Sequence, residues 1–430
     1  MTSPNRRLTM KDNQAKYPQL RFKGFTDPWE QRKLEKVFDT ITDYVANGSF
    51  ESLRKNVNSS DINGFAYLVR LQDASNNWQG PWLYTDQHGY EFLKKSRLQP
   101  DDIIMANVGS VGKFFLVPRL DKPMTLAPNA VLIKSSENDQ VFLYQMMLTP
   151  EMQYKIFEKT TPGVQSKINK TDFKMIETRL PNMDEQEKIG AFFKQLDDTI
   201  ALHQRKLDLL KEQKKGYLQK MFPKNGAKVP ELRFAGFADA WEQRKLGELF
   251  KPSRNKNNND LYNQKDILAA SLGTELIPKR TFFGLKSTKE SVKNYRVVKH
   301  GDLIYTKSPI KGFPNGIVRT NKGNVGIVPS LYCVYQAQKE INTSIIQLYF
   351  EDKNRLNFYL FPLVNVGARN NVNITDLEFL EGIIKVPKSI EEQKKIVDFI
   401  EHFNKAITLH QRKLDLLKEQ KKGFLQNMFV

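Results

Sequence analysis

The chain has 430 residues, 40% of them hydrophobic, which excludes a wholly disordered protein and leaves room for two or three domains with separate cores. No apolar run reaches the ~18 to 20 residues of a membrane span, the N-terminus lacks the apolar segment of a secretory signal, and the single cysteine, Cys333, excludes disulfide frameworks and cysteine-rich zinc sites. The net charge of +19 points to a polyanionic partner, the alternative being a basic surface that serves only solubility.

A basic polar arm leads into a motif that occurs twice. PQLRFKGFTDPWEQRKL at Pro18 to Leu34 returns as PELRFAGFADAWEQRKL at Pro230 to Leu246, 212 residues later. We call these two segments the leading repeats. Each is followed by a variable region and then by a second repeated segment, so the chain uses one arrangement twice.

The two variable regions, roughly residues 35–181 and 247–387, share little sequence but share landmarks. LQPDDIIM (Leu98 to Met105) and VVKHGDLIY (Val297 to Tyr305) both predict a turn followed by a buried strand. Further short apolar runs, separated by turn residues, predict mixed α/β domains: Tyr67 to Leu71, Phe114 to Val117, Ala130 to Ile133, Ile317 to Val318 and Leu331 to Tyr335.

Near its end, each variable region carries one of two segments that align without gaps. TPGVQSKINKTDF (Thr161 to Phe173) and NVGARNNVNITDL (Asn365 to Leu377) match at Gly163/Gly367, Thr171/Thr375 and Asp172/Asp376. A short strand ending in proline, at Pro181 or Pro387, is expected to follow each segment.

The second repeated segment, which we call the helical repeat, is almost identical in its two copies. Ile200 to Phe222 and Ile407 to Phe429 differ at only three positions and share HQRKLDLLKEQKKG. Apolar residues spaced four and three apart predict the seam of a coiled coil, with the two copies as partners. The seam residues are Ile189, Phe193, Leu196, Ile200, Leu207 and Leu210 in the first copy and Ile396, Ile400, Phe403, Ile407, Leu414 and Leu417 in the second.

Capping-box spacing at Asn182/Glu185 and Ser389/Glu392 predicts where these two helices start. From Ile189 to Met221 such a helix would be roughly 48 Å long. Residues 184–222 hold 8 basic and 7 acidic residues, and residues 388–430 hold 9 and 6, so +15 of the net charge of +19 lies outside the helices.

Motifs for catalysis are weak in this sequence. A DNA adenine methyltransferase would show an Asn/Asp-Pro-Pro-aromatic loop and a glycine-rich cofactor turn, but the chain has no Pro-Pro pair, and Gly109 to Lys113 is an incomplete phosphate loop. Asp101 and Asp102 fit a turn better than a nuclease carboxylate pair. His203 and His410 fall on the seam, where histidine more often fixes helix register than binds a metal. We therefore predict no catalytic and no metal-binding residues.

The combination of these motifs resembles the specificity (S) subunit of type I restriction-modification systems over nearly the whole chain. The residues that carry the resemblance are WEQRKL (Trp29 to Leu34 and Trp241 to Leu246), the helix starts at Glu185 to Ile189 and Glu392 to Ile396, and the repeated RKLDLLKEQKKG.

The resemblance implies an α+β fold in which an antiparallel coiled coil separates two α/β target recognition domains with pseudo-two-fold symmetry. Its implied segments are an N-terminal arm and leading repeat at 1–34, a first target recognition domain at 35–181, a central long helix at 182–222, a linker and leading repeat at 223–246, a second target recognition domain at 247–387 and a C-terminal long helix at 388–430.

By the same resemblance, each domain would read one half of a bipartite site on double-stranded DNA, and the helices would set the spacer and dock two methyltransferase subunits. Restriction/translocase subunits would complete the complex. The chain itself would be a non-catalytic, cytoplasmic subunit with no bound cofactor and no membrane contact. S-adenosylmethionine, ATP and magnesium are implied only for the partner subunits.

DNA contacts are expected from basic and amide side chains in loops, because lysine and arginine bind phosphates and Arg, Lys, Asn and Gln also read base edges. The candidates for the aligned loops are Gln165, Ser166, Lys167, Asn169, Lys170, Arg369, Asn370, Asn371 and Asn373. Candidates for contacts to the DNA backbone are Lys113, Arg119, Lys307, Lys311, Arg319 and Lys322.

Two other functions compete with this interpretation. An RNA-binding or architectural protein could use the same charge and helices, but the chain shows no aromatic signature of an RNA-recognition domain and no clamp of the Gly-x-x-Gly type placed between helices. A self-contained nuclease would need metal-binding carboxylates, for which the sequence offers no suitable set.

Overall fold

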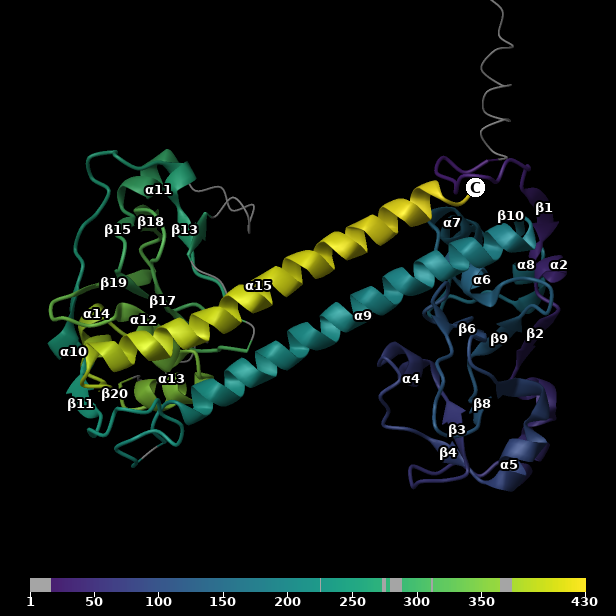
Figure 1. Ribbon diagram of the computed structural model, residues 1–430, viewed down its shortest axis with the longest axis horizontal. Coiled ribbons are helices and arrows are strands. Elements are labelled where there is room, and N and C mark those ends of the chain that lie inside the picture. Colours follow the sequence, from purple (N-terminus) through teal and green to yellow (C-terminus); the bar gives the residue numbers. More distant parts are fainter. Residues whose placement is uncertain (1–16, 225, 273–275, 279–287, 311, 364–372) are drawn as a thin grey trace, which may run out of the picture. The chain divides into compact units, whose positions relative to one another are not determined.

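The computed structural model describes residues 17–224, 226–272, 276–278, 288–310, 312–363 and 373–430, which form two compact units (Figure 1). Unit 1 comprises the described residues up to Leu202 together with Lys413–Val430. Unit 2 is the continuous segment His203–Arg412.

Unit 1 holds the first variable region and mixes short strands with short helices. Its strands are β1 (Glu30–Lys33), β2 (Thr40–Asp43), β3 (Ala66–Val69), β4 (Tyr84–Thr85), β5 (Arg97–Leu98), β6 (Ile103–Met105), β7 (Phe114–Leu116), β8 (Met124–Leu126), β9 (Val131–Lys134) and β10 (Glu177–Leu180). Its helices are α2 (Leu34–Val37), α3 (Phe50–Asn56), α4 (Leu71–Ser75), α5 (Gln87–Phe92), α6 (Gln140–Met147), α7 (Pro150–Glu158) and α8 (Lys170–Lys174). Short 3₁₀ turns lie at Tyr44–Asn47 and Lys94–Ser96.

Unit 2 holds the second variable region. Its strands are β11 (Glu242–Lys245), β12 (Phe250–Pro252), β13 (Leu268–Ala269), β14 (Ile277–Pro278), β15 (Arg296–Val298), β16 (Leu303–Thr306), β17 (Val318–Thr320), β18 (Gly326–Val328), β19 (Tyr332–Ala337) and β20 (Ile383–Val386). Its helices are α10 (Leu246–Leu249), α11 (Lys289–Lys293), α12 (Thr343–Phe350), α13 (Lys353–Leu360) and α14 (Asp376–Leu380), with a 3₁₀ turn at Gln264–Asp266.

The two units share the topology of their central sheets, although their sequences differ. Unit 1 has a four-stranded antiparallel sheet in the order β2-β9-β6-β7, and unit 2 has the matching order β12-β19-β16-β17. The strands β6 and β16 are those predicted after the shared turns, and their residues are completely buried. Unit 1 adds a second sheet, β4-β3-β8-β5, whereas unit 2 adds the pairs β15-β18 and β13-β14.

The leading repeat closes each domain. Its EQRK segment forms β1 in unit 1 and β11 in unit 2, and each pairs antiparallel with the strand just before a long helix, β10 or β20. The first strand of the domain therefore pairs with its last, and the chain leaves that strand directly into the long helix.

An arginine of each leading repeat anchors the start of a long helix. Arg21 donates from Nε and Nη2 to the carboxylate of Glu185, both at 2.7 Å, and Arg233 donates in the same way to Glu392 at 2.6 and 2.8 Å. Both carboxylates are buried, and these ion pairs raise the arginine pKa values above the ordinary range. Asn182 and Ser389 cap the backbone as predicted, while the glutamates of the expected capping boxes bind the leading repeats.

The helical repeats form two helices of 38 residues each, α9 (Met183–Lys220) and α15 (Ile390–Asn427). All the predicted seam residues are buried or half-buried. Within unit 1, Phe192 of α9 packs edge-to-face on Phe424 of α15, and within unit 2, Tyr217 of α9 packs on Phe399 and Phe403 of α15, so the segments run antiparallel in each unit. No helix among the described residues is long and apolar enough to cross a membrane.

The core of each unit takes the start of one long helix and the end of the other. In unit 1, Phe193 and Phe429 pack together, and Phe429 also meets Trp29 of the leading repeat. In unit 2, Phe222 packs edge-to-face on Trp241, the equivalent tryptophan. The repeated aromatic residues thus tie both helices to both leading repeats.

His203 and His410, at equivalent positions of the helical repeats, face each other within unit 2. Their Nδ1 atoms lie 3.0 Å apart, close enough for one ring to donate a hydrogen bond to the other. This polar pair is satisfied only when the two helices pack in this register, which fits the role proposed for these residues from the seam.

Candidate nucleic-acid interface

Two neighbouring loops of unit 1 bring together four of the candidate DNA-binding residues. Thr161 and Lys167 exchange two backbone hydrogen bonds, which close a hairpin that contains Gln165 and Ser166. The Gly109 amide donates to the Ser166 carbonyl at 2.8 Å and so joins this hairpin to the Gly109 to Lys113 loop. Gln165, Lys167 and Lys113 are exposed, whereas Ser166 is half-buried.

Helix α7 supports the Gly109 to Lys113 loop through hydrogen bonds. Gln153 donates from Nε2 to the carbonyl oxygens of Gly112 at 2.8 Å and Met147 at 2.7 Å. Gly112 has φ of +86°, which glycine adopts without strain, and a Cβ there would clash with Gln153. The incomplete phosphate-loop motif is therefore a turn braced against a helix.

Unit 2 repeats this bracing. Asn315 donates from Nδ2 to Oδ1 of Asn357 on α13 at 2.8 Å, and Gly316 matches Gly112 in position before the strand and in its φ of +80°. The candidates Lys311, Arg369, Asn370 and Asn371, which belong to the corresponding loops, lie outside the described residues. Asn373 is exposed just before α14.

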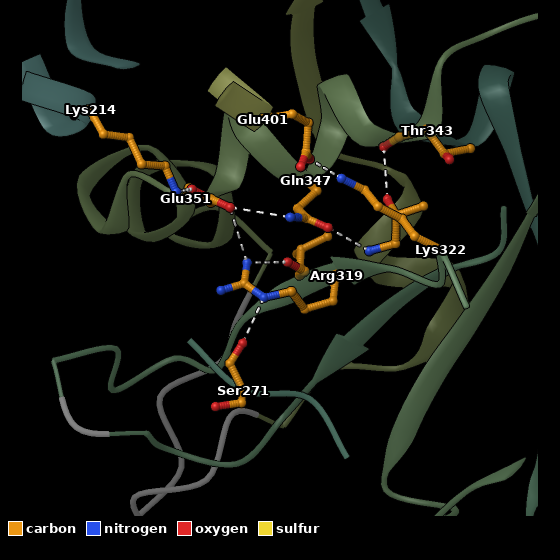
Figure 2. A network of polar contacts seen from close by, with 10 residues as sticks. Lys214, Ser271, Arg319, Lys322, Thr343, Gln347, Glu351 and Glu401 are labelled. Atoms are coloured by element: carbon orange, nitrogen blue, oxygen red, sulfur yellow. Dashed lines mark hydrogen bonds and ion pairs between the residues drawn. The ribbon is translucent and has the colours of Figure 1, made fainter. Parts of the chain in front are cut away.

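Arg319 lies in the interior of unit 2, which corrects its prediction as a DNA-backbone contact (Figure 2). Its side chain is 3% exposed, Nε donates to the Ser271 carbonyl at 2.9 Å, and Nη1 lies 3.6 Å from the Glu351 carboxylate. Glu351 also pairs with Lys214 of α9 at 2.6 Å. A guanidinium held in this way cannot reach a phosphate without breaking the network.

The charges in this network depend on one another. Burial by itself would raise the pKa of Glu351, but Lys214 and Arg319 outweigh that effect and hold the pKa below its ordinary value. Burial lowers the pKa of Arg319, and Glu351 opposes the shift. One carboxylate thus compensates a buried guanidinium and a half-buried ammonium.

Lys322 and Lys307 are half-buried rather than freely exposed. Lys322 forms an ion pair with Glu401 of α15, in the same region of unit 2 (Figure 2). The Lys322 ammonium is therefore already paired within this protein, and its contact to the DNA backbone stays a prediction. Lys307 follows β16 directly; the pKa of Glu378 is lowered mainly by the hydrogen bond from the Thr375 amide and to a smaller extent by the charge of Lys307.

Asn169 and Lys170 belong to the start of α8 rather than to the exposed hairpin. Asn169 caps the helix, because its Oδ1 accepts from the Asp172 amide at 2.7 Å, and Lys170 pairs with Asp43 at 2.7 Å. A base-reading role for Asn169 would uncap α8. The remaining unit 1 candidate, Arg119, is exposed. It follows the end of β7, whereas Lys113 directly precedes the start of that strand.

The structure shifts part of the gapless alignment of the two loop segments by two residues. Asn169 caps α8 and Thr375 caps α14, so these residues are equivalent, and Thr171 is not equivalent to Thr375. Buried Ile168 then matches buried Ile374. The alignment slipped because each segment contains two side chains that can cap a helix, and sequence alone does not say which one does.

Each unit carries a pair of exposed aromatic residues at matching positions, and these residues were not among the candidates predicted from the sequence. Tyr154 and Phe157 lie on α7, and Phe358 and Phe361 lie on or just after α13, each pair three residues apart and exposed. The helices correspond because both brace the equivalent glycine turn. The sequence does contain a signal for these pairs, because each aromatic residue of α7 has an aromatic counterpart 204 residues later, in a region that is otherwise dissimilar.

The described residues contain no cluster of three or more His, Cys, Asp or Glu side chains that could hold a metal ion. Asp102 accepts the Gln99 amide and pairs with Lys134, as a turn-forming residue does. Burial raises the pKa of the Cys333 thiol to about 12, so this cysteine stays protonated and a poor nucleophile.

The sequence matches the family described as the type I restriction modification DNA specificity domain, over residues 27–212 and again over 238–419. The chain belongs to this family. The specificity family accounts for the doubled architecture, because its domain occurs once in each half of the chain.

Relatives of this chain match it over nearly its full length. A protein assigned as the specificity subunit of the type I restriction enzyme MjaX, from Methanocaldococcus jannaschii, is 22% identical over 93% of this chain and 92% of its own length. The S subunit structure from M. genitalium has the same fold, with a TM-score of 0.60, 13% identity, and coverage of 96% of this chain and 99% of that one. An HsdS structure from Thermoanaerobacter tengcongensis gives a TM-score of 0.39 at 14% identity, covering 95% and 98%.

Proposed function

We propose that this chain is the non-catalytic subunit that gives a type I restriction-modification complex its DNA specificity, with each unit reading one half of a bipartite site on double-stranded DNA. The observation that carries the proposal is the pair of units with one sheet topology but different loops on it. Because the two units share one sheet topology, they would dock on DNA in the same manner. Because their loops differ, each unit would recognise a different base sequence. The basic charge outside the long helices supports DNA as the partner.

The test starts from the host, where sequencing of methylated adenines in cells carrying this chain and its methyltransferase subunit would define the site. Binding of the assembled complex to that duplex is then titrated against salt. We expect Lys113→Gln/Lys167→Gln to bind about 10- to 100-fold more weakly near 0.1 M salt and to lower the slope of log Kd against log salt by about 2, because two phosphate contacts are lost.

A variant that removes the same charge elsewhere in unit 1, Lys55→Gln/Lys94→Gln, serves as the control, since both lysines are exposed and lie outside the two loops. Its slope should stay close to that of the wild type. Equal slopes for all three proteins would exclude the two loops from the DNA interface, and a wild type that binds unrelated duplexes equally well would reject sequence-specific binding.

We further propose that features repeated on both halves dock two copies of one methyltransferase subunit. Unit 1 exposes Leu202 of α9 and Leu416 of α15, and unit 2 exposes Leu209 of α9 and Leu409 of α15, all on helix faces turned away from the seam. The aromatic pairs on α7 and α13 repeat as well. Two identical partners need two equivalent surfaces, and exposed leucine and aromatic side chains suit protein contacts.

Replacing Leu209 and Leu409 with glutamine should weaken binding of a methyltransferase subunit at least about tenfold, with little change in the stability of this chain. Native mass spectrometry of the complex would count the subunits retained. Leu261→Gln removes an equally exposed leucine of unit 2 that is not repeated, and it should leave the count unchanged. Retention of both subunits by the double variant would refute docking at this face.

A further inference from the structure

The hairpin between Thr161 and Lys167 has an apolar residue at its tip. Val164 is fully exposed, and Pro162, Gly163 and Gln165 around it are exposed as well. Its isopropyl group therefore projects into solvent from the same loop that carries Gln165 and Lys167.

The hairpin is held firmly at its base although its tip is free. Besides the two hydrogen bonds between Thr161 and Lys167, the Ser166 carbonyl accepts from Gly109, and the Ile168 amide donates to the Asn107 carbonyl at 3.1 Å. Ile168 itself is completely buried. A contact made by the tip would thus require little further ordering of the backbone.

We propose that Val164 and Gln165 together read an A·T base pair in the half-site bound by unit 1, an inference that rests on the DNA-binding function proposed above. Thymine is the base that presents a methyl group in the major groove, so an isopropyl group favours its C5-methyl over any other base edge. A glutamine amide can accept from N6 and donate to N7 of adenine in a bidentate pair.

The charges beside the tip suit this geometry. Lys167 closes the hairpin, and Lys113 ends the loop to which the hairpin is bonded, so the two loops that meet at the base of the hairpin carry two exposed lysines. Phosphate contacts of this kind position a protein on the duplex while the side chains between them meet the base edges.

The experiment removes the methyl group from the DNA and its partner from the protein. The full chain, assembled with its methyltransferase subunits, is titrated with the cognate duplex in which deoxyuridine replaces each thymine of the site in turn. At one thymine position of one half-site, the wild type should bind the deoxyuridine duplex about three- to fivefold more weakly, the size expected for one buried methyl group. Val164→Ala should bind the two duplexes within about 1.5-fold of each other at that position.

Gln165→Ala should bind the cognate duplex more weakly than the wild type does. The wild type should lose affinity in the same way when 7-deazaadenine replaces the adenine opposite the sensitive thymine. The proposal is overturned if the wild type shows no thymine preference anywhere, or if Val164→Ala keeps it. The exposed position of Val164 makes misfolding of the alanine variant an unsuitable explanation for either result. Failure of the wild type to bind the unmodified cognate duplex would instead reject the DNA-binding function itself.

Discussion

Glu351→Gln is expected to destabilise unit 2 by about 3 to 5 kcal/mol, because it leaves the buried Arg319 and the half-buried Lys214 without a compensating charge. The two cationic side chains are 13% and 3% exposed, so water can take over the role of the carboxylate only to a small extent. Urea denaturation with a probe in unit 2 would measure the loss.

Two further variants make this prediction specific. Glu212→Gln, on the same helix as Lys214, breaks an exposed ion pair with Lys215 and should cost less than about 1 kcal/mol. Adding Lys214→Met to Glu351→Gln should recover part of the stability, since one stranded cation is replaced by an apolar side chain. Stability of the single variant within about 1 kcal/mol of the wild type would contradict the role given to Glu351.

The same carboxylate should give unit 2 a dependence on acid. Because the folded-state pKa of Glu351 is held below its ordinary value of 4.5, its contribution is fully present above that pH and is lost as the pH falls through the folded value. The difference in stability between the wild type and Glu351→Gln should therefore shrink in that acid range and stay constant at neutral pH.

Inserting four residues into α9 after Leu202 is expected to abolish specific DNA binding. The insertion lengthens the helix by about 6 Å and turns the following part by about 40°, so the seam residues beyond it no longer face α15. Binding should return when four residues are also inserted after Leu409, because the two helical repeats then match again. A single insertion after Leu409 should behave like the first one.

If the helices set the distance between half-sites, the double insertion should methylate a site whose spacer is longer by about two base pairs, with both half-site sequences unchanged (~6 Å against 3.4 Å per base pair). Sequencing of methylated adenines would show this directly. An unchanged spacer would mean that the helices only tether the domains, and altered half-sites would mean that they take part in base reading.

The repeats made much of the fold predictable, whereas the interface depended on packing that sequence does not display. The long helices begin and end within a few residues of the predicted bounds, because caps and seam residues are local signals. The burial of Arg319 could not be foreseen, since arginine is usually exposed and its partner Glu351 lies on a different element. The hairpin tip was recognised as a loop, but the exposure of Val164 emerged only from the structure.

Unit 1 is assembled from two distant parts of the chain, and this has a consequence for protein synthesis. Phe429 and Met428 belong to the same core as Trp29 and Phe142, so that core is incomplete until the ribosome has made the last helix. Unit 2, by contrast, is one uninterrupted segment. We therefore expect unit 2 to complete its fold before unit 1, although most of unit 1 is translated first. Until the last helix is made, the part of unit 1 already translated keeps an apolar surface exposed, and chaperones would have to protect that surface from aggregation.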